Sequence, residues 1–343
     1  MSPPPEILFH RWFLQRFQPR TICTPAGDIY RPYKGKKDLA TLPAPLESLL
    51  TTIQSSFNEA LRDEKDIAEH VPHSPFYLDY IDSDIPNAFA FHSDDYSFIG
   101  ITIGLVNVLW ETCLRLSRSR QLANVLGIEA TSGLDEPLHV VLLRIQLNFV
   151  VTHEYTHHVH GHLSGSDFVD EIGEGGEDGN LIQQILEVDA DGYAAYHVLH
   201  HLTGVEGRSH AVKLLKLAAE GADTQDQRLF SCFVAAVGAY LFSRPPAPLD
   251  KRDIYELTHP PQAARMDCLM QRSIAWCKQN RPELAVWMGP RKFQSLMGAV
   301  ADATWGMNGG RDWTEQTEFL RSEAGAEYFK KLDKGFKSLL RSL

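Results

Sequence analysis

The stretch from Val150 to His162, VVTHEYTHHVHGH, decides how this chain is interpreted. Within it, residues His153 to His157 read HEYTH, which is the H-E-x-x-H pattern. Residues four positions apart share one face of a helix, so both imidazoles can point at a single metal ion. Glu154 stands beside them, where a carboxylate can take a proton from a water molecule on that metal. The stretch therefore predicts a catalytic metal site on a helix.

The residues before this motif, VVLLRIQLNFVV, have the apolar content of a buried helix, which we expect over about 137–161. Catalytic zinc takes three protein ligands and a water molecule, so a third ligand is needed. No histidine stands six residues beyond His157, where metzincins carry theirs. The other nearby histidines lie too close along the helix to complete the site easily, and we expect them on the surface or behind the ligands: His158, His160 and His162.

A better third ligand lies downstream, in the expected helix LIQQILEVDADGYAAYHVL. Glu187 can supply a carboxylate oxygen to zinc. Asp191 follows four residues later on the same face, where it can accept a hydrogen bond from the outer nitrogen of a ligand histidine. The alternative is an exposed acidic helix, but the apolar neighbours Ile185, Leu186 and Ala190 favour burial of at least one of these acids. The predicted zinc ligands are therefore His153, His157 and Glu187.

These residues resemble a known family. An H-E-x-x-H motif followed about thirty residues later by E-x-x-A-D, here Glu187 to Asp191, is the pattern of gluzincin metallopeptidases. The chain most resembles the HtpX and CAAX-prenyl-endopeptidase group. Pro86 to Ala90 (PNAFA) and the following Ile99 to Leu105 resemble that group's strand and its turn into a helix. The segment Thr258-His259-Pro260-Pro261, with Arg265 six residues after the histidine, resembles its T-H-P-x-x-x-x-R motif.

The resemblance covers about residues 78–272 and implies further roles. The strand from Asn87 to Phe91 should be an edge strand that borders the active-site cleft and pairs with the backbone of a peptide substrate. The residues of this strand predicted to bind substrate are Asn87, Ala88, Phe89 and Ala90. His259 should help to stabilise an oxyanion, and Arg265 should organise that corner of the site. The plainer interpretations are a loop-to-helix junction at His259 and a salt bridge from Arg265 to Asp191 or another acid.

The remaining pattern predicts an α+β fold that is mostly helical, with a zincin-like core. Short aromatic and β-branched runs over 76–103 predict a small sheet. Helices are expected near 45–62, 105–126, 181–202, 209–220, 227–242, 261–278, 282–304 and 314–343. Proline and glycine cluster in the first 45 residues and predict an irregular arm. We expect an N-terminal arm and helix over 1–75, a catalytic domain over 76–280 and a helical extension over 281–343, packed together.

Charge and composition limit the partners and the location. The net charge is −11, and residues 145–207 hold eleven acids without a lysine or arginine, which argues against nucleic acid as a partner. The apolar run over 229–243 is too short to cross a bilayer and predicts a core helix. Members of the resembled group often carry transmembrane helices, and we expect none here. No secretory signal is evident at the N-terminus. Five cysteines without a C-x-x-C pair indicate free thiols and a cytoplasmic location.

The sequence thus predicts a zinc-dependent endopeptidase that acts on a protein or peptide substrate with one Zn²⁺ per chain. A metal-dependent amidase acting on a small substrate is an alternative, because the ligand set fits both. A degenerate fold with a binding or regulatory role is another, although a structural zinc site has no use for the base Glu154. A latent peptidase, covered by residues 164–179 or by the N-terminal arm, is a third. A soluble relative such as the phage-exclusion Lit peptidases shows a weaker resemblance, at Glu187 to Gly192.

Overall fold

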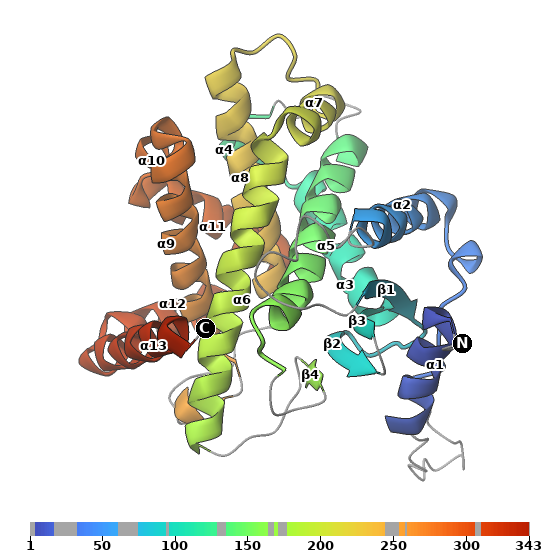
Figure 1. Cartoon of the computed structure of the whole chain (residues 1–343). Helices are drawn as coiled ribbons and strands as arrows, with labels where there is room; N and C mark the ends of the chain where they lie inside the picture. The colour runs from blue at the N-terminus through green and yellow to red at the C-terminus, as the bar shows by residue number, and fades with distance from the viewer. Residues whose placement is uncertain are drawn as a thin grey trace, which may run out of the picture. The chain divides into compact units, whose positions relative to one another are not determined.

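The structure is a computed structural model that describes residues 4–16, 33–60, 75–93, 96–128, 135–163, 168–170, 177–243, 254–257, 259–305 and 310–342. The described chain is mostly helical with a small mixed sheet, which confirms the α+β expectation (Figure 1). It divides into two compact units, residues 1–108 with 154–173 and residues 109–153 with 174–343. Two unbroken helices, α3 (Ile103–Arg118) and α5 (Asp135–Val159), pass from one unit to the other.

The first unit is built on a sheet of four strands in the order β1-β3-β2-β4. These are β1 (Phe76–Ile81), β2 (Ala88–Ser93), β3 (Tyr96–Thr102) and β4 (Phe168–Asp170). The first pairing, β1 with β3, is parallel, whereas β2 pairs antiparallel with both β3 and β4. The three longer strands lie where the aromatic and β-branched runs predicted them.

The expectation that Asn87 to Phe91 forms an edge strand is wrong. Strand β2 lies inside the sheet, because Phe89, Ala90 and Phe91 pair on the second side with Asp170, Val169 and Phe168 of β4. The sequence gives little sign of this pairing, since β4 has only three residues and lies in a glycine-rich acidic stretch that is typical of a loop.

A helix that the sequence analysis missed covers one face of this sheet. Helix α1 (Pro5–Arg16) lies in the segment expected to be an irregular arm (Figure 1). Four of its residues and five from the strands form one buried cluster: Leu8, Phe9, Trp12 and Phe13 with Tyr77, Ile81, Phe89, Phe91 and Phe98. The indole of Trp12 stacks on the ring of Phe91 with centroids 3.9 Å apart. Burial against the sheet, more than local propensity, accounts for this helix.

The C-terminal end of α5 is fixed to the same sheet. Tyr155 packs its ring on Phe76 of β1 and on Phe57 of helix α2 (Ala44–Ala60). His158 donates a hydrogen bond from Nε2 to the carbonyl oxygen of Phe98 in β3, at 2.9 Å. Tyr155 and His158, on either side of His157 in the sequence, therefore anchor this turn of the helix, so the turn has a defined rotation against the sheet.

The second unit is helical. It contains α4 (Arg120–Leu126), α6 (Glu177–Thr203), α7 (Val205–Leu214), α8 (Ala222–Leu241), the 3₁₀ helix η3 (Ile254–Glu256), α9 (Gln262–Asn280), α10 (Pro282–Trp287), α11 (Pro290–Trp305), α12 (Gly310–Arg321) and α13 (Glu323–Ser342). Three expected helices are each divided in two. The breaks fall at Ser119, which caps α4 with its side chain, at Met288–Gly289 and at Ser322. Within the described part of the chain, no helix combines the length and apolar content that a bilayer-spanning segment needs.

Helix α6 is central to this unit and packs against α7, α8, α9, α13 and η3. Its Ile185 joins a buried cluster with Ile254, Ala264, Tyr328 and Leu332. Gln184 donates from Nε2 to the carbonyl oxygens of Ile254 and Leu257, and its Oε1 accepts a hydrogen bond from the hydroxyl of Tyr328. One buried amide thus ties the segment before His259 to α6.

Candidate metal centre

The predicted motif lies on α5, where the apolar run over 140–151 makes the middle of the helix a core element. His153, Glu154 and His157 are all buried. Because α5 is unbroken from Asp135 to Val159, the two histidines stand one helical turn apart on one face. Burial of a polar side chain costs free energy unless the group has a hydrogen-bond, ion-pair or metal partner. The contacts of these side chains therefore indicate what the site can bind.

The predicted third ligand lies on α6. Glu187 and Asp191 are both buried, so the alternative of an exposed acidic helix is wrong for these two residues. Glu187 Oε2 lies 3.3 Å from His153 Nε2, and Asp191 Oδ1 lies 3.1 Å from His153 Nδ1. The two carboxylates therefore flank one imidazole, each facing a different ring nitrogen.

The donor set suits zinc. One ligand atom from each of His153, His157 and Glu187 lies within 4.8 Å of the other two. Two ligands bonded at about 2.0–2.1 Å to a tetrahedral zinc lie about 3.3 Å from each other. The distance between His153 Nε2 and Glu187 Oε2 has this value. The residues present thus fit a zinc ion, and Asp191 Oδ1 lies beside the outer nitrogen of His153, where ligand histidines usually have a carboxylate or carbonyl neighbour.

Arg265, in the first turn of α9, completes this arrangement. Its Nε donates to Asp191 Oδ2 and its Nη2 donates to Asp191 Oδ1, both at 2.8 Å. Burial alone would raise the pKa of Asp191, but the guanidinium outweighs it and holds that pKa below its usual value. Asp191 is therefore an anion that orients His153. The salt bridge from Arg265 to Asp191 that was considered from the sequence is present, and Asp191 is part of the candidate metal centre.

The charge balance around His153 favours a cation. Burial alone would lower the pKa of this imidazole, but Glu187 and Asp191 overcome that effect and raise the pKa well above its ordinary value. The two carboxylates therefore stabilise positive charge at this position. The same carboxylates can stabilise a divalent cation.

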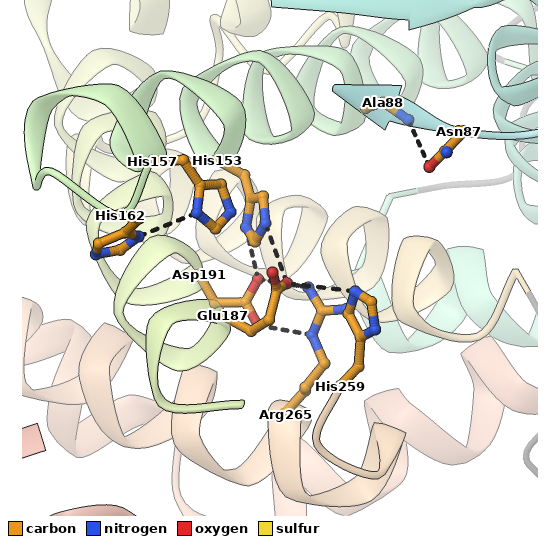
Figure 2. A network of polar contacts seen from close by, with 9 residues as sticks. All are labelled: Asn87, Ala88, His153, His157, His162, Glu187, Asp191, His259 and Arg265. Atoms are coloured by element: carbon orange, nitrogen blue, oxygen red, sulfur yellow. Dashed lines mark hydrogen bonds and ion pairs between the residues drawn. The ribbon is translucent and has the colours of Figure 1, made fainter. Parts of the chain in front are cut away.

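His259 lies at the same carboxylate. Its Nε2 is 3.7 Å from Glu187 Oε2, and Nη2 of Arg265 is 3.8 Å from the same oxygen (Figure 2). The segment before His259 is held to α6 by Gln184, as described above. The chain thus brings a third imidazole to the site, after those of His153 and His157, from a segment more than seventy residues beyond Glu187, as the resemblance implied. Thr258, the first residue of that motif, lies outside the described residues.

His162, expected on the surface or behind the ligands, is buried and lies behind His157. Helix α5 ends in a Schellman-type turn, with the N–H of His162 bonded to the carbonyl oxygen of His157 at 2.9 Å. Gly161 has φ +69°, a left-handed conformation that glycine adopts readily. This turn folds the chain back, and His162 Nδ1 meets His157 Nδ1 at 3.0 Å (Figure 2). The glycine after the helix in HVHGH was the signal available in the sequence.

The tautomers of this histidine pair follow from its geometry. One Nδ1 must donate and the other must accept. If His157 binds a metal through Nε2, its Nδ1 carries the proton and His162 accepts it, which places the proton of His162 on Nε2. A second set of potential ligand atoms, from His160, His162 and Asp189, also lies within 4.8 Å of one another. A metal on Nε2 of His162 would compete with that assignment.

No family model, curated protein or solved structure matches this chain. The gluzincin resemblance therefore rests on the motif residues alone.

The predicted substrate-binding residues lie in the first unit, at the start of β2. Thr102 Oγ1 holds the backbone of Asn87 at both its N–H and its carbonyl, with distances of 2.9 Å. The side-chain Oδ1 of Asn87 accepts a hydrogen bond from the N–H of Ala88 at 3.0 Å, as drawn in Figure 2. Its Nδ2 is buried and has no hydrogen-bond partner among the described residues. Asn87 therefore presents a fixed amide with donor capacity left over.

Proposed function

We propose that this chain is a zinc-dependent endopeptidase of gluzincin type. The observation that carries the proposal is the 3.3 Å separation of His153 Nε2 from Glu187 Oε2, with His157 one turn further along the same helix. A buried histidine–histidine–glutamate set is a ligand set of catalytic zinc. When bound there, zinc supplies a water molecule of lowered pKa and a Lewis acid for the scissile carbonyl.

Residues of the chain supply the remaining catalytic and positioning roles. Glu154 accepts a proton from the attacking water on its carboxylate and returns it to the nitrogen of the leaving amine. Asp191 keeps the proton of His153 at Nδ1, so that Nε2 presents a lone pair. Arg265 keeps Asp191 charged and in position. His162 accepts the Nδ1 proton of His157, so that Nε2 of His157 also presents a lone pair.

His259 is the proposed oxyanion donor. Its imidazole reaches the Glu187 carboxylate from the side of α9, and it is only partly buried, with 19% of the side chain exposed. A donor aimed at the charge that develops on a carbonyl oxygen lowers the barrier by about 3 kcal/mol in comparable sites. This role needs a donor at the rim of the site, which is where a partly exposed imidazole can meet a substrate.

A peptide substrate is proposed from the resemblance and from Asn87 to Ala90. The unused Nδ2 of Asn87 is a donor suited to a backbone carbonyl of an extended chain. The four described cysteines are free, which supports the expected reducing, cytoplasmic setting. Retention of Glu154 favours an active enzyme over a degenerate one, because a purely structural zinc site needs no base.

The proposal is tested by a proteome-wide search for new protein N-termini. Cells that express the wild-type chain are compared with cells that express Glu154→Gln at the same level. We expect N-termini that occur only with the wild type, grouped in a small number of proteins. Equal sets of N-termini, with both proteins folded and loaded with zinc, would contradict the proposed activity.

A further inference from the structure

Strand β2 has two unequal neighbours. On one side, β3 pairs with every residue from Ala88 to Ser93. On the other side, β4 pairs with Phe89, Ala90 and Phe91 alone, through Asp170, Val169 and Phe168. Strand β4 comes from the connection between α5 and α6, the two helices that carry the candidate metal ligands. A short strand from the loop after the H-E-x-x-H helix therefore covers this side of β2.

The covered side is the one that a peptide would use. If a substrate adds to β2 as a further strand, it needs backbone N–H and C=O groups that no other strand holds. The hairpin with β3 uses one side of β2 completely. Only the side that β4 now occupies can accept another chain. This step rests on the proposed peptidase function.

Strand β2 does not depend on β4 for its place. Phe89 and Phe91 belong to the aromatic cluster beneath α1, and the Trp12 indole stacks on Phe91. Six residue pairs join β2 to β3, whereas three join it to β4. Strand β4 is shorter than the usual five to six residues of a strand, so its ladder is the weaker one. Removal of β4 would leave β2 folded and one side open.

The same part of β2 lies beside the end of α5. Ala90 packs against Leu163, six residues after His157. The ring of His92 lies 4.8 Å from the ring of His158, which in turn bonds to β3. All of these residues belong to the first unit, which also holds Glu154 and His157. The strand covered by β4 is therefore attached to the turn of helix that bears the catalytic base.

We propose that β4 is an autoinhibitory strand, which occupies the substrate's place on β2 and must leave before an extended peptide can bind antiparallel to β2. The chain as folded is then a latent peptidase, and β4 is its latch. The substrate forms the same kind of hydrogen-bonded ladder with β2 as β4 does, but extends it beyond three residue pairs. The longer ladder has more hydrogen bonds, so the substrate displaces β4.

The composition of β2 also defines the class of substrate. Ala88 and Ala90 are small and fully buried, and Phe89 and Phe91 are committed to the cluster under α1. The strand therefore offers its backbone and no side-chain pocket of its own. We expect an unfolded polypeptide segment, read through its backbone with little sequence preference on this side, instead of a small amide or a folded surface.

A reversible cross-link tests the latch directly. Ala90 and Val169 are opposite each other in the register, so Ala90→Cys with Val169→Cys can form a disulfide that holds β4 on β2. The probe is carboxymethylated, fluorescently labelled α-lactalbumin, which is permanently unfolded. We expect the reduced double variant to hydrolyse this probe and the oxidised form to lose at least about tenfold in rate, with recovery on reduction by a phosphine. The single variant Val169→Cys, treated identically, should not respond. Equal rates before and after oxidation would overturn the proposal.

A second pair of variants covers the risk that a cysteine at buried Ala90 prevents folding. The N–H groups of successive strand residues point to opposite sides, so only one of Phe168→Pro and Val169→Pro removes a hydrogen bond to β2. The other is its matched control. We expect one variant to hydrolyse the probe several-fold faster than wild type and the other to resemble wild type. If both have the wild-type rate, the latch is refuted.

The failure of the latch can be told from failure of the proposed function. The cross-linked pair is also made with Glu154→Gln, and binding of the probe is followed by fluorescence anisotropy. Binding of the probe to the reduced form but not to the oxidised form would support the latch. This measurement does not require catalysis. If that result is joined by no hydrolysis from any zinc-loaded form with Glu154 present, the peptidase function is wrong while the latch stands. Equal binding by both forms refutes the latch.

Discussion

Arg265 donates two hydrogen bonds of 2.8 Å to the carboxylate of Asp191, and the same carboxylate lies 3.1 Å from Nδ1 of His153. All three side chains are buried. The guanidinium therefore sets the charge and the direction of the group that orients a metal ligand. A single arginine, outside the ligand set, links the stability of the second unit to its chemistry.

Removal of this arginine should damage both properties. Arg265→Ala leaves a buried carboxylate with one partner fewer, so we expect a loss of about 3–5 kcal/mol in the free energy of unfolding. Zinc affinity should fall by about 10–100-fold, because Asp191 is no longer held against His153. Urea unfolding and a competitive zinc titration measure the two effects. Lys278→Ala, which changes an exposed lysine in the last turn of the same helix, is the control and should change the free energy of unfolding by less than about 0.5 kcal/mol.

A double variant separates the two contributions. In Arg265→Ala with Asp191→Ala, neither charge is left alone in the interior. We expect this variant to be less destabilised than the sum of the two single variants, since each single change also leaves the other charge uncompensated. Strict additivity of the unfolding free energies would mean that the two residues act independently, contrary to the geometry.

His162 should matter for the metal more than for the fold. His162→Ala removes the acceptor at Nδ1 of His157, and we expect zinc affinity to fall by about 10–100-fold. The matched control is His200→Ala, an exposed histidine in the last turn of α6. Zinc titration of both variants should show a loss for His162 alone. An unchanged affinity for His162→Ala would remove this residue from the centre.

The adjacent residues His157 and His158 should give opposite results. His157→Ala removes a ligand, so we expect loss of tight zinc binding. His158→Phe keeps a ring against Phe76 but loses the bond to the carbonyl oxygen of Phe98. That change should lower the free energy of unfolding by about 1–3 kcal/mol and leave zinc affinity near wild type. If His158→Phe loses zinc as His157→Ala does, the ligand assignment along α5 is wrong.

The described cysteines should be unreactive in the folded chain. Burial raises the pKa of Cys232, Cys268 and Cys277 to about 12, and that of Cys113 well above its usual value. A thiol with a pKa of about 12 is ionised in only about one molecule in 10⁴ at pH 8, and the thiolate is the reactive form. Titration with a chromogenic disulfide at pH 8 should therefore detect at most one fast thiol, Cys23, which lies outside the described residues, and five thiols in urea. Two or more fast thiols in the folded chain would contradict this burial.

Much of the centre could be predicted from the sequence, because its residues lie in pairs spaced by four positions on two helices. The pair His153 and His157 follows from the helical repeat, and Glu187 with Asp191 from a second helix with an apolar face. Burial of Glu187 and Asp191, and their contacts with His153, agree with those expectations. The zinc ion and the peptidase activity stay predictions.

The parts that were missed depend on tertiary contacts. Helix α1 follows a run of prolines, and its aromatic residues become helical because they pack on β2 and β3. Strand β4 has three residues in an acidic, glycine-rich segment, and only its pairing with β2 makes it a strand. The orientation of His162 depends on one glycine in a left-handed conformation. Leu8, Phe9, Trp12 and Phe13 do recur at helical spacing, whereas β4 and the turn at Gly161 have no period in the sequence.

Zinc content tests the central claim most directly. The purified wild-type chain and Glu154→Gln are dialysed against the same zinc buffer, and bound metal is measured by elemental analysis with the fold monitored by circular dichroism. We predict about one zinc per chain for both proteins, because His153, His157 and Glu187 hold the metal without help from Glu154. Fully folded wild-type protein that binds no zinc would contradict the account.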